Sequence, residues 1–339
     1  MEAFVKSFAT YRTIKKATVI TSALTLDSLE ADTSTVTVAG TGIGRSNTGD
    51  WLLIDGLVFQ ISNVKPQGDR TLLTLLPPLE AFNRPLELQI LQKDQYIGNF
   101  IMETMKSQWV NCEDPVYTMP YLTIITTDPT PYVEPDLDNS GCFSLAAYCR
   151  LMRKTYRTTV RFADAGNSLA CVITNVPTAS RKVDFTDGRS QLQSVDYSSS
   201  GTAKLTVLCD VDTGNKDANG EPILERQRSV WYLSEDGKAS QAIPARRASG
   251  EWKNINVKKV EEIETKVNET FAKNKANHKL EFWSTRDLAV QDDCTFLVYG
   301  EILQSYISYK RKSSEDKRFY YKSGELATTA TEKLKGVVK

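Results

Sequence analysis

The sequence predicts a β-rich α+β protein with two similar small antiparallel β-barrel lobes, an α/β insertion and a long connecting helix. Residues 49–62 and 292–304 predict the paired lobes, because each stretch has an acidic turn, a short apolar strand, a glycine and a second strand with a glutamine. Period-two alternation and frequent turn residues predict further strands, and apolar residues at helical spacing predict three helices.

The chain length predicts several lobes, because a single hydrophobic core stops growing at about 250 to 300 residues and this chain has 339. We expect a first β-barrel lobe over 1–95, a helix-containing α/β lobe over 96–175, a β-rich lobe over 176–250, a helix with a second β-barrel lobe over 251–325, and a polar C-terminal tail over 326–339.

The charge and the cysteines narrow the class of protein. Lysine plus arginine and aspartate plus glutamate number 42 each, so the formal charge is zero and no basic field attracts nucleic acid. A net charge near zero also favours self-association. The six cysteines form no CxxC pair, which argues against a zinc site. We find no secretory signal and no membrane span, and expect folding in a cytoplasm with reduced cysteines.

Residues 17–92 are expected to form the first β-lobe. Residues 35–38 alternate with period two. Residues 51–61 form the strands of the first paired stretch, 49–62, and residues 71–76 add a strand that Pro77 ends. Glycine-containing turns separate these runs, so short antiparallel strands closing into a small barrel or sandwich are predicted.

The next segment changes from strands to a mixed pattern. Apolar residues at helical spacing predict a helix over 96–110, and the apolar segment 121–125 follows it. Prolines punctuate residues 126–141, and each disfavours helix before it, so this stretch is predicted to be a linker.

The clearest helix of the first half is predicted over 145–156. Its apolar residues lie on one face, and its basic residues lie near the C-terminal end, where they complement the helix dipole. Residues 158–162 and 169–173 then predict two strands joined by a turn. A helix followed by a hairpin indicates a compact α/β insertion.

Residues 183–243 are strand-like again. Strands are predicted over 204–208 and 229–233, joined by the polar loop 210–221, and a tight turn at 235–238 ends the second strand.

A second amphipathic helix is predicted over 255–275, where two Glu–Lys pairs at i,i+4 spacing support it. The β-unit that contains the second paired stretch, 292–304, follows this helix. Its hairpin turns through the charged run 310–318. The residues after 324 form the polar tail.

Two loops resemble ligand sites only superficially. Gly40, Gly42 and Gly44 lack the helix that a dinucleotide fingerprint requires after its glycines, so a glycine-rich hairpin loop is the favoured interpretation. The cluster around Asp210 suggests a calcium loop, but Gly214 and Lys216 break the alternate spacing of an EF-hand, so a solvated hairpin loop is favoured. The cluster consists of Asp210, Asp212, Asp217 and Asn219.

Catalytic arrangements find equally little support. His278 is the only histidine, and no GxSxG turn accompanies it, so we interpret it as a surface residue. The pairs Asp292–Asp293 and Glu261–Glu262 could serve a glycosidase, but 42 acidic residues make such pairs inevitable. The five tryptophans are dispersed and are interpreted as separate core anchors; they are Trp51, Trp109, Trp231, Trp252 and Trp283. The sequence therefore assigns no catalytic, cofactor-binding or metal-binding residue, and no cofactor.

In this order the features resemble the tail-tip hub proteins of tailed bacteriophages, also called tail-associated or baseplate hub proteins. The unit from Gly49 to Ile61 carries part of the resemblance, and the middle segment 143–173 carries more. Residues 229–237 and the helix leading into 292–309 complete it, so that it covers most of the chain.

The resemblance implies a homotrimeric ring whose two barrels per subunit present six-fold pseudosymmetry to a hexameric tail tube. It implies a hub that closes the channel, opens for DNA passage, and contacts the distal tail ring protein, the tape measure protein and further tip or receptor-binding proteins. The implied location is the tip of the virion tail, after assembly in the host cytoplasm. Many relatives continue into receptor-binding or wall-degrading regions, whereas this chain ends at Lys339, so we expect a structural protein that is not an enzyme.

Two other functions stay open on the residues alone. A receptor- or carbohydrate-binding tail-tip module is the alternative, with Trp231 or Trp283 as the glycan-binding ring, and a cell-wall glycosidase is a remote one. The paired units also differ in spacing by one residue, Asp50 to Gly56 against Asp293 to Gly300. A duplication is therefore expected only if both units fold in the same way.

Overall fold

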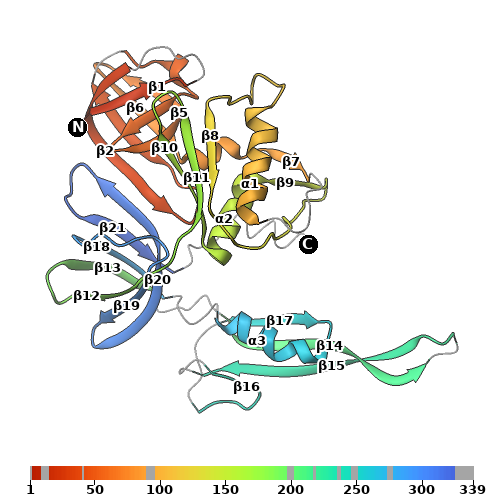
Figure 1. Cartoon of the computed structure of the whole chain (residues 1–339). Coiled ribbons are helices and arrows are strands. Elements are labelled where there is room, and N and C mark those ends of the chain that lie inside the picture. The colour runs from red at the N-terminus through yellow and green to blue at the C-terminus, as the bar shows by residue number, and fades with distance from the viewer. Residues whose placement is uncertain are drawn as a thin grey trace. The chain divides into compact units, whose positions relative to one another are not determined.

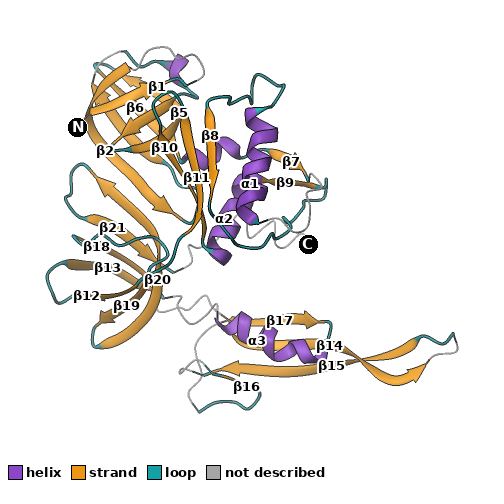
Figure 2. Ribbon diagram, viewed as in Figure 1, coloured by secondary structure: helices purple, strands orange, loops and turns teal. Residues whose placement is uncertain are grey.

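The structure is a computed structural model that describes residues 2–8, 15–39, 42–88, 96–196, 202–216, 219–234, 238–245, 251–272 and 278–324. Strands dominate it and helices are few, which confirms the predicted β-rich α+β class (Figures 1 and 2). The chain divides into two compact units, Met1–Ala179 with Tyr309–Tyr320, and Ser180–Ser308 with Tyr321–Lys339.

A closed six-strand barrel occupies the start of the first unit. Its strands pair in the order β1–β4–β5–β6–β3–β2, and a β1–β2 ladder closes the ring. Alternate side chains such as Val36, Val38, Leu73 and Leu75 are fully buried inside it, because successive residues of a strand point to opposite faces. The strands are β1 (Glu2–Lys6), β2 (Lys15–Ser28), β3 (Ser34–Ala39), β4 (Trp51–Ile54), β5 (Leu57–Gln67) and β6 (Arg70–Leu76), with the 3-10 helix η1 (Arg45–Asn47) before β4.

An α/β lobe follows in the same unit. The strands β8 (Leu122–Thr126), β10 (Thr158–Asp164) and β11 (Leu169–Asn175) form its sheet, in which β8 lies parallel to β11. The helix predicted over 96–110 is α1 (Ile97–Met105) continued by the π-helical turn η3 (Lys106–Val110). The smaller elements are η2 (Pro78–Phe82), β7 (Pro85–Glu87) and β9 (Cys142–Ser144).

The helix predicted over 145–156 is confirmed as α2 (Leu145–Tyr156). Ser144 caps its first turn by accepting a hydrogen bond from the Ala147 N–H at 3.3 Å. Arg157 ends it in the left-handed conformation with φ 64°. The predicted hairpin after it is β10 paired with β11.

The barrel and the α/β lobe share one hydrophobic core. Trp51 and Val58 point outward from the barrel and pack in the same buried cluster as Phe82 and Trp109. Polar contacts add to this, because the Arg153 guanidinium of α2 binds the Asp27 carboxylate of β2 through two hydrogen bonds of 2.7 and 2.8 Å.

The second unit contains another six-strand sheet, here called the second sheet. Its strands pair in the order β12–β19–β20–β21–β18–β13. If these six strands are numbered 1 to 6 in chain order, they pair in the order 1–4–5–6–3–2. The six strands of the barrel, numbered in the same way, pair in the same order. One difference is that β12 lies parallel to β19, whereas β1 is antiparallel to β4. The strands are β12 (Ser180–Asp184), β13 (Ser190–Asp196), β18 (Lys279–Ser284), β19 (Asp293–Val298), β20 (Glu301–Ser313) and β21 (Phe319–Ser323), of which residues 309–320 belong to the first unit.

A separate sheet is inserted between β13 and β18. Its strands pair in the order β16–β15–β14–β17, and the helix α3 packs on it through Val267 and Phe271. The elements are β14 (Thr202–Lys216), β15 (Pro222–Leu233), β16 (Ala239–Ser240), β17 (Glu251–Val257), the 3-10 helix η4 (Val260–Glu262) and α3 (Ile263–Ala272).

Two boundaries in this inserted sheet differ from the sequence prediction. Residues 255–257 are strand, not helix, because β17 pairs with β14 as far as Val257 and the helical turns begin only at Val260. The polar loop predicted over 210–221 is mostly strand, because β14 continues to Lys216 and pairs with β15. The predictions for Gly40, Asp217, residues 235–237 and 273–275, and the tail after Gly324 lie outside the described residues.

Candidate functional site

The candidate site is a hairpin that occurs twice, as β4–β5 in the barrel and as β19–β20 in the second sheet. Each hairpin turns through two residues with positive φ, Asp55 and Gly56 at 50° and 74°, and Tyr299 and Gly300 at 49° and 86°. Such pairs of positive φ values are typical of a type I′ turn, whose twist matches that of the flanking strands. The two turns therefore have the same backbone form.

The bases of the two hairpins share a hydrogen-bond pattern. In the first hairpin, Gly49 N–H donates to the Ile61 carbonyl at 2.8 Å, and Ile61 N–H donates to the Asp50 carbonyl at 2.8 Å. In the second hairpin, Gln291 N–H donates to the Ile307 carbonyl at 2.7 Å, and Ile307 N–H donates to the Asp292 carbonyl at 3.0 Å.

A third backbone hydrogen bond is also the same at the two bases. Asp50 N–H reaches back to the Asn47 carbonyl at 3.2 Å, and Asp292 N–H reaches back to the Ala289 carbonyl at 3.1 Å. The counterpart of Asp50 is therefore Asp292.

This equivalence corrects the spacing inferred from the sequence. The difference between the hairpins is two residues per strand, not one, because β4 has 4 residues and β19 has 6. Side chains alternate between faces along a strand, so an insertion of two residues keeps every later side chain on its original face, whereas an insertion of one would reverse them. The longer hairpin thus keeps the same alternation of side chains between the two faces as the shorter one.

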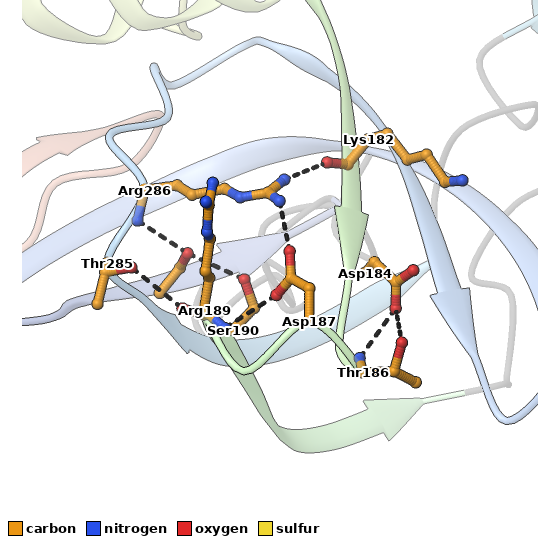
Figure 3. Close-up of polar contacts among 9 residues, drawn as sticks. Lys182, Asp184, Thr186, Asp187, Arg189, Ser190, Thr285 and Arg286 are labelled. Atoms are coloured by element: carbon orange, nitrogen blue, oxygen red, sulfur yellow. Dashed lines mark hydrogen bonds and ion pairs between the residues drawn. The ribbon is translucent and has the colours of Figure 1, made fainter.

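Arg286 bridges β12 and the turn before β13 (Figure 3). Where a backbone ladder closes the barrel between β1 and β2, the Arg286 guanidinium donates to the Lys182 carbonyl of β12 at 2.7 Å and binds the Asp187 carboxylate in the turn before β13. Thr285 N–H donates to the Arg189 carbonyl at 3.0 Å.

The turn between β12 and β13 is also held by its own side chains. In Figure 3 the Thr186 hydroxyl and N–H both donate to Asp184, and these hydrogen bonds keep the pKa of that carboxyl below its usual value. The hydroxyls of Ser190 and Ser284 lie 3.0 Å apart across β13 and β18.

The residues singled out as catalytic or metal candidates do not form one site. His278 is half-buried, and its Nδ1 lies 2.8 Å from the Gln304 carbonyl. Asp292 is buried and pairs with Arg181 at 3.3 Å, whereas Asp293 is exposed as the next residue of the strand. Glu261 and Glu262 are exposed in η4. Within the described residues, no group of three or more histidine, cysteine, aspartate or glutamate side chains could hold a metal ion.

Asp210 and Asp212, considered above as part of a calcium loop, have separate partners. The Asp210 carboxylate accepts two hydrogen bonds from the Arg226 guanidinium across the β14–β15 pair, at 2.8 and 3.0 Å, and this arginine lowers its pKa. Asp212 instead accepts from the Gly214 N–H at 2.8 Å. These carboxylates therefore serve the local strand and turn.

Three of the five tryptophans are buried, as the core-anchor interpretation predicts, one is half-buried and one is exposed. Trp51, Trp109 and Trp231 are buried, and Trp283 is half-buried, so the Trp231 ring offers no surface for a sugar. Trp252 is 57% exposed, its Nε1–H donates to the Thr206 hydroxyl at 2.8 Å, and the Lys204 ammonium lies 4.0 Å from its ring. The prediction missed this ring because the edge strand β17 was not predicted, and its last residues, 255–257, were assigned to a helix.

The fold is that of a class of bacteriophage tail proteins. No protein-family model matches the chain, and no curated protein matches it. Among solved structures, it is similar to the prophage tail protein gp18 from Listeria monocytogenes, with a TM-score of 0.59, 10% identity, and coverage of 100% of this chain and 98% of that chain.

Two more tail proteins share the fold over almost the whole chain. The tail protein from Neisseria meningitidis gives a TM-score of 0.53 at 10% identity, covering 95% of this chain and 96% of that chain. The 43 kDa tail protein of prophage MuSo2 from Shewanella oneidensis gives a TM-score of 0.51 at 13% identity, covering 96% of this chain and 98% of that chain.

No helix among the described residues is long and apolar enough to cross a membrane.

Proposed function

We propose that this chain is a structural, non-enzymatic hub at the distal end of a bacteriophage tail or a related tail-like particle. In the proposed assembly three copies form a ring that adapts to a hexameric tail tube, closes its channel and opens for DNA passage. Its partners are then a second and third copy, the distal tail ring protein and the tape measure protein.

The observation that carries the proposal is the repeated strand order within one chain. Three chains that each hold two lobes of the same strand order present six similar lobes, which is the number that a six-fold tube requires. The matching hairpins support this, because their turns have the same signs of φ and their bases the same hydrogen bonds. The shared fold with three tail proteins supports the tail location.

The test is the mass of the purified protein in solution, measured by light scattering over a wide concentration range, alone and with the tail ring protein encoded by the same phage. We expect the mass of three chains and a stable complex with the ring protein. A chain that stays monomeric and ignores the ring protein would overturn the proposal.

A carbohydrate- or receptor-binding tail-tip module is the second candidate function, and the exposed Trp252 favours it. The Lys204 ammonium lies over the indole ring, so the exposed part of the ring supplies an apolar surface and the ammonium a hydrogen-bond donor, which together suit a sugar ring. Screening the protein against immobilised glycans tests this, with Trp252→Ala expected to abolish any binding and Trp283→Ala expected to preserve it. No binding by the unaltered protein would remove this candidate.

A further inference from the structure

The second hairpin carries an apolar face in which two side chains are exposed and one, Leu297, is half-buried. Leu297 and Ile302 are directly opposite each other in the β19–β20 ladder, and Tyr299 follows at the turn. Ile302 is 69% exposed and Tyr299 is 87% exposed. We call these three residues the hairpin face.

The same positions in the first hairpin are covered. Counting from the matched turns, Leu53 corresponds to Leu297 and Val58 to Ile302, and these two are also cross-strand partners. Val58 is only 4% exposed and belongs to the core shared with the α/β lobe, and Leu53 packs against that core. Leu53 and Leu297 are both half-buried, so the two copies differ at the position across the ladder, where Val58 lies in an internal interface of the chain and Ile302 is exposed.

The turn residue differs between the copies in a way that folding alone does not explain. The first turn has Asp55, a residue type that tolerates positive φ, whereas the second has Tyr299 at φ 49°, where a bulky side chain is disfavoured. Strained positions of this kind concentrate at functional sites, and tyrosine is enriched among residues that dominate protein interfaces.

We propose that the hairpin face of Leu297, Tyr299 and Ile302 docks on a second copy of this chain. The first hairpin supplies the argument for that occupant, because there the equivalent face is already covered by another part of this same chain. The hairpin face carries no charged side chain, and the zero net charge of the chain leaves little repulsion between copies.

A contact between this face and a different surface of the next copy forms a ring when the rotation between successive copies closes after three. The inference rests on the proposed ring and identifies the residues that hold it together.

The test compares the association of the unaltered protein with that of a Tyr299→Asp, Ile302→Thr double variant. The substitution at 299 gives the second turn the residue that the first turn has, so folding should be preserved, and an unchanged thermal midpoint checks this. Sedimentation equilibrium should show an apparent dissociation constant raised about tenfold or more, as expected when interface anchors are removed.

Leu224→Thr is the matched control, because Leu224 is an exposed apolar residue, at 57%, on the inserted sheet. It should associate like the unaltered protein. Ile302→Thr alone is the second variant, in case the change at 299 disturbs the turn, and should weaken association in the same direction.

The possible outcomes separate this inference from the proposed function. A trimer that the double variant leaves intact would overturn the docking face and keep the ring. A two-fold dimer broken by the double variant would keep the docking face and overturn the ring. A protein that is monomeric at every concentration would overturn both.

Discussion

The hydroxyl group of Tyr321 joins β21 to the segment between β18 and β19. The ring is fully buried beside Phe282, with centroids 5.2 Å apart. Its hydroxyl donates to the Arg286 carbonyl at 2.8 Å and accepts from the Leu288 N–H at 3.0 Å. Burial raises the pKa of this phenol above its ordinary value, so the neutral form that makes both hydrogen bonds persists at neutral pH.

Tyr321→Phe is expected to lower the free energy of unfolding by about 1 to 3 kcal/mol, because it leaves a buried backbone N–H and a buried carbonyl without their partner. Urea unfolding followed by circular dichroism measures the change. Tyr299→Phe is the control and should change the free energy by less than about 0.5 kcal/mol, since that ring is exposed. Equal effects of the two substitutions would contradict this account of Tyr321.

Helix α2 ends at a residue whose backbone conformation is strained. Ser144 supplies a favourable N-terminal cap, but the last position is Arg157 with φ 64°, a conformation that glycine adopts without strain and arginine does not. The described contacts at this position use the backbone: Arg157 N–H donates to the Arg153 carbonyl, and the Arg157 carbonyl accepts from Val176 N–H. The side chain is exposed.

Arg157→Gly should therefore raise the free energy of unfolding by a few tenths to about 1 kcal/mol. This gain is the relieved backbone strain minus the entropic cost of glycine's greater flexibility in the unfolded chain. Thermal unfolding of the two proteins under identical conditions measures it. Arg161→Gly makes the same chemical change in the middle of β10 and should destabilise the protein, because glycine weakens a strand. A loss of stability in both variants would refute the proposed strain.

At the scale of the whole molecule, the repeated strand order indicates which segments are additions. The counterparts of β13 and β18 are β2 and β3, which residues 29–33 join directly. In the second unit the inserted sheet interrupts this connection, and its buried residues, such as Leu205, Trp231 and Phe271, form a core of their own. The insertion is therefore expected to be separable from the second sheet.

Replacing residues 197–277 by a short glycine- and serine-rich turn should leave a protein that unfolds cooperatively and keeps its strand content. Far-ultraviolet circular dichroism and limited proteolysis test this. Removing residues 279–298 instead deletes β18 and β19 and should expose the second unit to proteolysis. Loss of cooperative unfolding in the first variant would show that the insertion is part of the second sheet's folding unit.

The sequence by itself determined the elements whose signals are local. Alternating residues such as Val36 and Val38 identify strands, the apolar stripe and the basic residues near its C-terminal end identify α2, and the glycines at 56 and 300 mark the two turns. Local backbone preference and side-chain periodicity set these features, so they are readable without knowledge of contacts.

Only the tertiary structure decided the pairings between distant segments. The parallel pairing of β17 with β14 makes residues 255–257 strand despite their helical spacing, and β12 pairs with β19 more than a hundred residues later. It also showed that Asp292, not Asp293, is the counterpart of Asp50, and that Arg286 bridges β12 and the turn before β13. Such contacts depend on which surfaces meet after the chain has closed long loops, and no short stretch of sequence encodes that.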